Sequence, residues 1–280
     1  MATKGIVSGV IANMVTLKVD GPVAQNEICF IETGGDKLMA EVIKVVGDNV
    51  YVQVFESTRG LMVGATAEFT EHMLEVTLGP GMLSHNYDGL QNDLDKMTGV
   101  FLKRGEYTYP LDNDKLWHFI PLAKVGDQVK ASDWLGEVEE NFQKLKIMTP
   151  FQMEGTYTIK SIVAEGDYRI IDTVAVLENA KGEQLEVNMI QKWPVKLAMT
   201  NYQEKPRPFK LLETGVRSID TLNPIVEGGT GFIPGPFGTG KTVLQHAISK
   251  QAEADIVIIA ACGERANEVV EIFTEFPELD

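Results

Sequence analysis

One octapeptide in the last quarter of the sequence constrains the fold most: Gly235-Pro236-Phe237-Gly238-Thr239-Gly240-Lys241-Thr242. It fits the pattern G-x-x-x-x-G-K-[ST], the phosphate-binding P-loop. The glycines allow a tight turn that aims successive backbone N–H groups at a phosphate, and the following helix adds its positive N-terminal end. In this interpretation Lys241 neutralises the outer phosphates, and Thr242 offers its hydroxyl to a magnesium ion.

A P-loop needs a strand before it and a helix after it, and the sequence predicts both. Residues 231–233 form a short apolar run that ends at Pro234-Gly235, which is typical of a strand stopped by a turn. Beyond the motif, apolar residues recur four positions apart, which predicts a helix. Ile256–Ala261 is an unbroken run rich in β-branched residues, which predicts a fully buried parallel strand. We therefore expect one βαβ unit around the loop.

Composition narrows the classes of function. The 280 residues leave room for two or three domains, and a hydrophobic content of 44% is ordinary for a soluble globular protein. A formal net charge of −15 argues against nucleic acid as a partner, because no basic patch balances it. We expect no secretory signal at the start and no membrane-spanning run, so any link to a membrane would go through other subunits. Cys29 and Cys262 lie outside metal-binding spacings, which favours two buried thiols in a reducing compartment.

The remaining sequence predicts a mixed fold in four parts. Residues 1–75 contain closely spaced alternating runs with turn residues between them, which indicates a small antiparallel β-barrel. Residues 76–110 are interpreted as a connector that runs along the nucleotide-binding domain. Residues 111–195 predict a β-rich insertion, and residues 196–280 the first part of an α/β P-loop nucleotide-binding domain. Within this last part, Thr214 is a plausible N-cap for a short helix.

The insertion resembles the barrel-sandwich hybrid of biotinyl and lipoyl carriers. Those carriers present a modified lysine at a tight turn, typically between methionines. Here Lys144 and Lys146 precede Ile147-Met148 without that flanking pattern. We therefore expect a structural insertion without a prosthetic group. His85, in the connector, is expected to be a surface or structural side chain rather than a ligand.

Several motifs together resemble the rotary ATPase family. They are Thr214–Asp220, Pro224, the P-loop and Gly263-Glu264-Arg265. Within the family, the P-loop sequence, Cys262–Arg265 and Gln191–Val195 are similar to the catalytic A subunits of V-type and archaeal-type enzymes. The long insertion is a feature of that subunit, and the resemblance covers essentially the whole chain.

The resemblance implies an ATPase or ATP synthase that couples ATP hydrolysis or synthesis to proton or sodium transport. The implied ligands are ATP or ADP and Mg²⁺. It implies that Lys241 contacts the β- and γ-phosphates, Thr242 the magnesium, and that residues 235–243 cradle the nucleotide, Val243 included. Glu264 would polarise the attacking water beside Arg265. The implied partners are non-catalytic B subunits in an alternating hexameric ring, and central-stalk and peripheral-stalk subunits. The ring would be cytoplasmic, and its membrane contact indirect.

Glu264 also has an interpretation independent of the family. It would lie just past the carboxyl end of a buried strand, where open α/β sheets place their ligand crevice. A carboxylate there can accept a hydrogen bond from the water that attacks a phosphate. The alternative is that Glu264 only complements the start of the next helix. Phe237 cannot donate a side-chain hydrogen bond, so we interpret it as a packing residue.

Other functions remain open at this stage. A ring subunit that binds nucleotide without hydrolysis is disfavoured because both Lys241 and Glu264 are present. A secretion-system motor is disfavoured by the insertion, an RNA-translocating helicase by the acidic charge, and a pure assembly module by the intact P-loop. The sequence stops at Asp280 without the later strand that ends in an aspartate, the adenine pocket or a helical tail. We therefore expect an N-terminal portion of a longer protein, with weak ATP binding and negligible turnover by itself.

Overall fold

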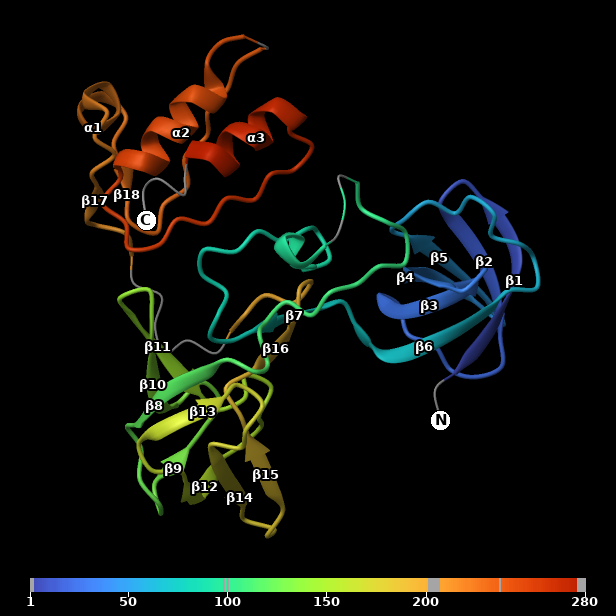
Figure 1. Cartoon of the computed structure of the whole chain (residues 1–280), viewed down its shortest axis with the longest axis horizontal. Helices are drawn as coiled ribbons and strands as arrows, with labels where there is room; N and C mark the ends of the chain where they lie inside the picture. Colours follow the sequence, from blue (N-terminus) through green and yellow to red (C-terminus); the bar gives the residue numbers. More distant parts are fainter. Residues whose placement is uncertain (1–2, 98, 100, 201–206, 237, 276–280) are drawn as a thin grey trace. The chain divides into compact units, whose positions relative to one another are not determined.

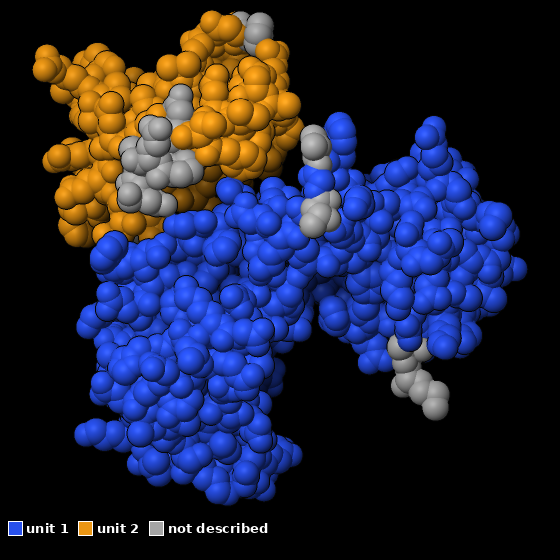
Figure 2. Space-filling view, viewed as in Figure 1, with its two compact units in different colours: residues 1–202 blue, residues 203–280 orange. Residues whose placement is uncertain are grey.

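The structure is a computed structural model that describes residues 3–97, 99, 101–200, 207–236 and 238–275. The chain divides into two compact units, residues 1–202 and residues 203–280, which are coloured separately in Figure 2. Across the described ranges, none of the helices has the length and apolar character needed to cross a membrane.

The N-terminal part is a closed six-stranded barrel in the order β1-β2-β5-β4-β3-β6, which confirms the predicted fold (Figure 1). The alternation of buried and exposed side chains along each strand explains this fold. In β5, Val50, Val52 and Val54 are buried, whereas Tyr51 faces outward. Closure leaves no unpaired strand edge in the barrel. The strands are β1 (Lys4–Ile11), β2 (Met14–Val19), β3 (Glu27–Thr33), β4 (Asp36–Val46), β5 (Asn49–Val54) and β6 (Thr66–Met73).

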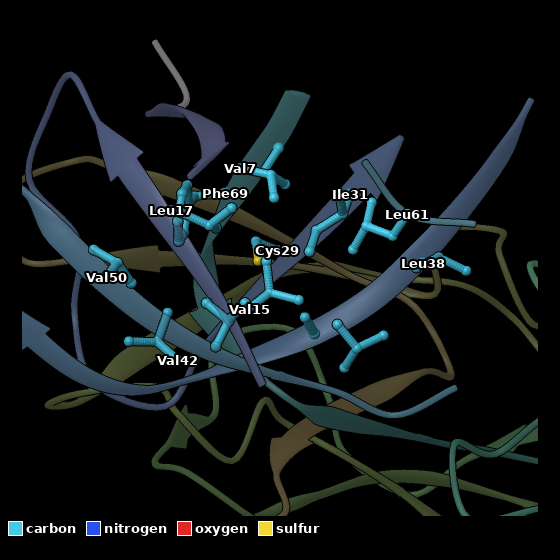
Figure 3. Packing of buried hydrophobic residues seen from close by; sticks show 14 residues of the cluster. Val7, Val15, Leu17, Cys29, Ile31, Leu38, Val42, Val50, Leu61 and Phe69 are labelled. Carbon is cyan, nitrogen blue, oxygen red and sulfur yellow. The ribbon is translucent and has the colours of Figure 1, made fainter. Parts of the chain in front are cut away.

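The barrel core is a single apolar cluster (Figure 3). Leu17, Ile31 and Phe69 come from three different strands and are almost fully buried. Cys29 lies among them, as expected of a packed thiol. Burial, and to a lesser degree the charge of Glu27, raises the pKa of the Cys29 thiol to about 12.

The connector packs against the barrel through half-buried polar contacts. The hydroxyl of Tyr107 accepts a hydrogen bond from the N–H of Met39 at 2.9 Å and donates one to Glu56 at 2.9 Å. The connector includes β7 (Glu75–Leu78), which pairs with β16 (Gln191–Pro194), so its start is joined to the end of the insertion. It also contains a 3₁₀ turn, η1 (Leu94–Lys96).

The insertion consists of two four-stranded antiparallel sheets, in the orders β11-β10-β8-β13 and β15-β14-β12-β9. Each sheet contributes to its own apolar cluster, with Phe119 fully buried in one and Leu177 in the other. The β character predicted for this region is confirmed. The strands are β8 (Leu116–Pro121), β9 (Gln128–Val129), β10 (Trp134–Glu140), β11 (Gln143–Met148), β12 (Tyr157–Ile162), β13 (Gly166–Arg169), β14 (Ala175–Asn179) and β15 (Gln184–Val187).

The two lysines of the carrier-like hairpin are engaged in ion pairs. Lys144 Nζ lies 3.0 Å from Glu137 Oε1, and Lys146 pairs with the other oxygen of the same carboxylate. Both lysines belong to β11, whereas Asn141 and Phe142, both with positive φ, form the turn. The lysines therefore stand along the strand and stabilise the hairpin.

The described residues of the second unit form three helices and a two-stranded ribbon. The helix predicted after the P-loop is present as α2, and the helix predicted after Arg265 is present as α3. The elements are β17 (Leu211–Leu212), α1 (Arg217–Leu222), β18 (Ile225–Val226), α2 (Lys241–Gln251) and α3 (Ala266–Glu275).

The two strands predicted beside the P-loop are absent from the described residues. Residues 231–233 and Ile256–Ala261 have no strand conformation, and the side chains of Phe232 and Ile258 are 87% and 89% exposed. A strand persists only when a neighbour pairs with its backbone groups, and the sole strand pairing described in this unit is β17 with β18. The prediction of a buried parallel strand was therefore wrong for this chain.

Two further predictions need correction. Cys262 is exposed, because it follows a segment that is not buried. Thr214 is not the N-cap of α1, since Val216 occupies that position without a side-chain cap. Thr214 is instead fully buried, and its hydroxyl donates to Asp220 Oδ1 at 2.6 Å, which ties the turn to the helix.

Candidate functional site

The backbone of the P-loop adopts conformations that glycine permits. Gly235, Gly238 and Gly240 have φ values of 150°, 81° and 80°, which residues with a Cβ rarely adopt. Between them, the hydroxyl of Thr239 donates a hydrogen bond to the carbonyl oxygen of Pro236 at 2.8 Å. The predicted site residue Phe237 lies outside the described residues. The motif therefore forms a tight loop that leads directly into a helix.

Helix α2 begins at Lys241, immediately after the loop. Its N-cap residue, Gly240, has a left-handed backbone conformation and makes no side-chain cap hydrogen bond. The first N–H groups of a helix have no partner within the helix, and together with the helix dipole they favour an anion. Lys241 is exposed, Thr242 is half-buried, and the side chain of Val243 is 73% exposed. This end of α2 can therefore receive a phosphate group.

A small groove brings Thr242 and Glu264 together, although they are far apart in the sequence. The groove has a cavity volume of about 20 Å³, so it can hold a single water rather than a nucleotide. Its remaining walls come from apolar residues of 259–261 and α3. Its polar lining residues are Thr242, Gln245, His246, Ser249, Glu264 and Glu268.

The carboxyl group of Glu264 is electrostatically perturbed. A hydrogen bond with Glu268 is the main cause that raises the pKa of Glu264, and desolvation adds to it. The charges of Lys241 and His246 act in the opposite direction and lower this pKa. The charge of Lys241 therefore acts on Glu264. Residues of α2, the helix that follows the P-loop, line one side of their groove.

Arg265 directly follows Glu264 in the sequence. It is exposed, and the described residues that line the groove do not include it. Its carbonyl oxygen accepts the hydrogen bond from Val269 N at 3.0 Å at the start of α3. Glu264 lies two residues before α3 and follows an exposed segment rather than a buried strand. The structure thus joins Thr242 with Glu264 and leaves Arg265 outside their groove.

Four polar residues of the groove were not predicted from the sequence, although their spacing marks them. Gln245, His246 and Ser249 follow Thr242 by three, four and seven positions, so they share its face of α2. Glu268 follows Glu264 by four positions. A search for polar residues at helical spacing from Thr242 and Glu264 would have found all four.

The groove offers one oxygen donor at the start of α2 that suits a magnesium ion. Mg²⁺ prefers oxygen ligands and retains several waters, so the hydroxyl of Thr242 is the candidate ligand. A separate cluster of His85, Asp93 and Asp95 also brings three potential ligand atoms within 4.8 Å of one another. There, however, Lys96 Nζ lies 3.1 Å from the buried Asp93 Oδ2, so the lysine already supplies positive charge.

Three domains of known protein families match consecutive parts of the chain. The beta-barrel domain of the ATP synthase alpha/beta family matches residues 7–71. The barrel-sandwich domain of ATP synthase alpha/beta subunits matches residues 108–196, and the nucleotide-binding domain of the ATP synthase alpha/beta family matches residues 215–280. The matched segments follow the barrel, the insertion and the second unit in order.

Curated relatives align with nearly all of the chain. It is 53% identical over 282 residues to the V-type ATP synthase alpha chain of Borrelia hermsii, with 100% of this chain and 49% of the relative covered. It is 50% identical to the protein of the same name from Treponema denticola, with 99% and 48% covered. A third, from Borreliella burgdorferi strain B31, is 50% identical, with 100% and 49% covered. The chain thus spans about half the length of the curated relatives it matches.

Proposed function

The chain belongs to the ATP synthase alpha/beta family, and on that premise we propose that it is the nucleotide-binding part of a catalytic A subunit of a rotary ATPase. The complete subunit couples ATP hydrolysis or synthesis to proton or sodium transport. The observation that carries the proposal is the shared groove of Thr242 and Glu264 at the start of α2, where the N-cap residue Gly240 makes no side-chain cap hydrogen bond. Binding of ATP or ADP at this loop is the first step that the proposal requires.

Each residue of the loop has a role in the proposal. The backbone of residues 235–240 and the first N–H groups of α2 hold the phosphates, and Lys241 neutralises their outer charge. Mg²⁺, held by Thr242, supplies positive charge against the phosphate oxygens when bound. Val243 contributes its backbone N–H at the start of α2, since its side chain is exposed. Pro236 accepts the hydrogen bond from Thr239 within the loop. Phe237, which lies outside the described residues, is proposed as a packing residue.

Glu264 orients the water that attacks the terminal phosphate. A carboxylate only accepts hydrogen bonds, so an ionised Glu264 can fix the direction of a water in a groove that has space for one. Arg265 adds positive charge from the neighbouring position. This role for Arg265 requires its side chain to turn toward the nucleotide, because it lies outside the groove of Glu264.

The proposed setting is a hexameric ring. In it the subunit alternates with non-catalytic B subunits and contacts central-stalk and peripheral-stalk subunits. The complex is attached to a membrane through other subunits, on the cytoplasmic side. The chain itself is strongly acidic, with a net charge of −15, which disfavours a nucleic-acid partner.

Nucleotide binding by the 280-residue chain tests the proposal directly. Isothermal titration with Mg-ATP should give weak binding, and Lys241→Ala should reduce the affinity about tenfold or more, because charge-assisted hydrogen bonds contribute about 1.5–3 kcal/mol. Lys250→Ala removes a lysine from the last turn of the same helix and serves as the matched control. Equal affinities for the parent chain and Lys241→Ala would contradict the proposed site.

The catalytic role requires a second measurement in the assembled ring. Glu264→Gln in the full-length subunit should leave Mg-ATP affinity unchanged and abolish turnover. ATP turnover at the normal rate in Glu264→Gln would show that Glu264 does not orient the attacking water. Tight binding without turnover by the unmodified ring would instead favour a non-catalytic nucleotide-binding subunit.

A further inference from the structure

Residues 213–220 form a compact turn, the anchor turn, which is closed by its own polar groups. Asp220 Oδ1 accepts hydrogen bonds from the N–H of Thr214 at 3.1 Å and from its hydroxyl at 2.6 Å. The same hydroxyl accepts a hydrogen bond from the N–H of Val216 at 3.2 Å. Among the residues that the structure describes in the second unit, Thr214 is the only one that is fully buried. The anchor turn is therefore held in shape by contacts within itself.

The anchor turn contacts the C-terminal end of α2, the end away from the P-loop (Figure 1). Glu253 N, just beyond the helix, donates a hydrogen bond to Glu213 O at 3.1 Å. Gly215 comes so close to Gln251, the last residue of α2, that an added Cβ would lie 2.9 Å from the Gln251 Cβ. That Cβ is bonded directly to the helix backbone, so rotation of the Gln251 side chain cannot relieve the overlap. A larger residue at position 215 therefore requires the end of α2 to move.

The position of this helix end matters for the P-loop because a helix transmits a displacement along its length. Gln251 lies about 15 Å from Lys241 along the axis of α2. The N–H groups at the start of α2 have no partner within the helix and must point at one phosphate group. A helix that could tilt at its far end would lose this orientation, and misplaced groups bind and act less well.

We propose that the anchor turn positions α2 for nucleotide binding, and that Gly215 is the positioning residue at the contact. Thr214 and Asp220 keep the turn closed, and Gly215 lets it approach Gln251. None of these residues lines the groove of Thr242 and Glu264, so they act on the nucleotide only through the helix. The inference rests on the proposed function in one respect, which is that the phosphates bind at the start of α2.

Gly215→Ala in the 280-residue chain tests the contact. The added methyl group should displace the end of α2 and weaken Mg-ADP binding in isothermal titration by roughly two- to thirtyfold, the range over which residues remote from a ligand modulate its binding. In the nucleotide-free chain, hydrogen exchange should become faster at the amide of Glu253 and in the last turn of α2, because their hydrogen bonds are disturbed. Unchanged exchange in this part of the chain would overturn the proposal.

Gly228→Ala is the matched control for backbone strain. Both glycines are left-handed, with φ values of 71° at Gly215 and 74° at Gly228, but a Cβ at Gly228 would meet no atom within 4 Å. The control therefore introduces the same strain without the contact, and its Mg-ADP affinity and α2 exchange should match those of the parent chain. Equal losses in the two variants would also overturn the proposal, since strain alone would then explain them.

Gln251→Gly tests the same contact from the other side, because it removes the Cβ with which the new methyl group collides. Glycine destabilises a helix, so Gln251→Gly by itself should bind Mg-ADP no more tightly than the parent chain. The double variant Gly215→Ala/Gln251→Gly should nevertheless bind Mg-ADP more tightly than Gly215→Ala. A general loss of stability would accumulate in the double variant instead. A double variant that bound no better than Gly215→Ala would contradict the positioning role.

The two readouts separate this inference from the proposed function. If the parent chain bound no nucleotide, the proposed function would fail, and hydrogen exchange in α2 would still decide whether the anchor turn holds the helix. If Gly215→Ala changed the exchange but bound Mg-ADP like Gly228→Ala, the nucleotide site would stand and the positioning role would fall. Helical circular dichroism equal to that of the parent chain shows that each variant compared is folded.

Discussion

The hydroxyl of Thr239 donates to the carbonyl oxygen of Pro236 at 2.8 Å, and this bond closes the P-loop on itself. It also constrains Gly235, because a Cβ at that position would overlap the Thr239 hydroxyl. A loop that must aim several N–H groups at one phosphate benefits from such internal fixation, since less conformational entropy is lost on binding. The hydrogen bond thus links the shape of the loop to its proposed function.

Removal of this bond should weaken nucleotide binding moderately. Thr239→Val keeps the shape of the side chain but lacks the donor, and a hydrogen bond of this kind contributes about 0.5–1.5 kcal/mol, or roughly two- to tenfold in affinity. Isothermal titration with Mg-ADP measures the change. Thr239→Ser retains the hydroxyl and should bind like the parent chain. If Thr239→Val bound Mg-ADP as well as Thr239→Ser, the loop would not depend on this contact.

A second prediction concerns the packing of the insertion. A Cβ added to Gly136 would overlap the fully buried ring of Phe119 and lie 2.7 Å from the carbonyl oxygen of Ile120. Gly136→Ala should therefore destabilise the insertion by about 1–3 kcal/mol, the usual cost of overpacking. Urea unfolding followed by tryptophan fluorescence reports on this region, because Trp117 belongs to the same core cluster.

The matched control for this prediction is Gly9→Ala. Gly9 also lies in a strand, but a Cβ there would have its nearest neighbours at 3.9 Å, an ordinary contact distance. This substitution should leave the unfolding of the insertion unchanged. The double variant Gly136→Ala/Phe119→Leu should lose less stability than the two single changes added together, since the smaller side chain leaves space for the methyl group. Strict additivity would contradict the proposed overlap.

The difference between the barrel and the second unit shows what sequence patterns can predict. The alternation of Val50, Val52 and Val54 was a reliable guide because the barrel strands find their pairing partners nearby in the sequence. Ile256–Ala261 has equally strong β character, yet it forms no strand among the described residues. Pairing is not a local property, so an apolar run predicts a strand only where its neighbours are present.

The same contrast between local patterns and non-local packing applies to the candidate site. The motif placed Lys241 and Thr242 at the start of a helix because a P-loop is a local structure. The groove that Glu264 and Glu268 share with Thr242 depends on how α2 and α3 pack. No motif states that packing, although the four-residue spacing of the two glutamates is compatible with their lining one groove.

The two cysteines should differ sharply in reactivity. Cys29 is buried in the barrel and burial raises its pKa to about 12, so little reactive thiolate forms at neutral pH. Cys262 is exposed. A coloured disulfide reagent should modify one thiol in each native chain and two after denaturation. Cys262→Ser should remove the native reaction, whereas its loss in Cys29→Ser instead would contradict the structure.

A final prediction concerns pH and the surface of the insertion. His118 on β8 lies directly opposite Asp167 on β13, with Nδ1 2.8 Å from Asp167 Oδ1 and Nε2 3.3 Å from Glu165 Oε1. The hydrogen bond to Asp167, followed by that to Glu165, raises the pKa of His118 above its ordinary value of 6.5. Because the folded state binds the proton more tightly, this interaction stabilises the protein fully below pH 6.5. The contribution is lost as pH rises through the folded-state pKa.

Proton NMR of the histidine ring measures this effect in the intact chain, with His118→Gln to assign the signal. Asp167→Asn should lower the titration midpoint of His118, because the principal carboxylate is removed. Glu165→Gln should lower it less, since that contact is longer, at 3.3 Å. The advantage of the parent chain over Asp167→Asn in thermal stability should be larger at pH 5.5 than at pH 8.5. An advantage that grew toward alkaline pH would have the wrong sign for a protonated His118 and would exclude this ion pair as its source.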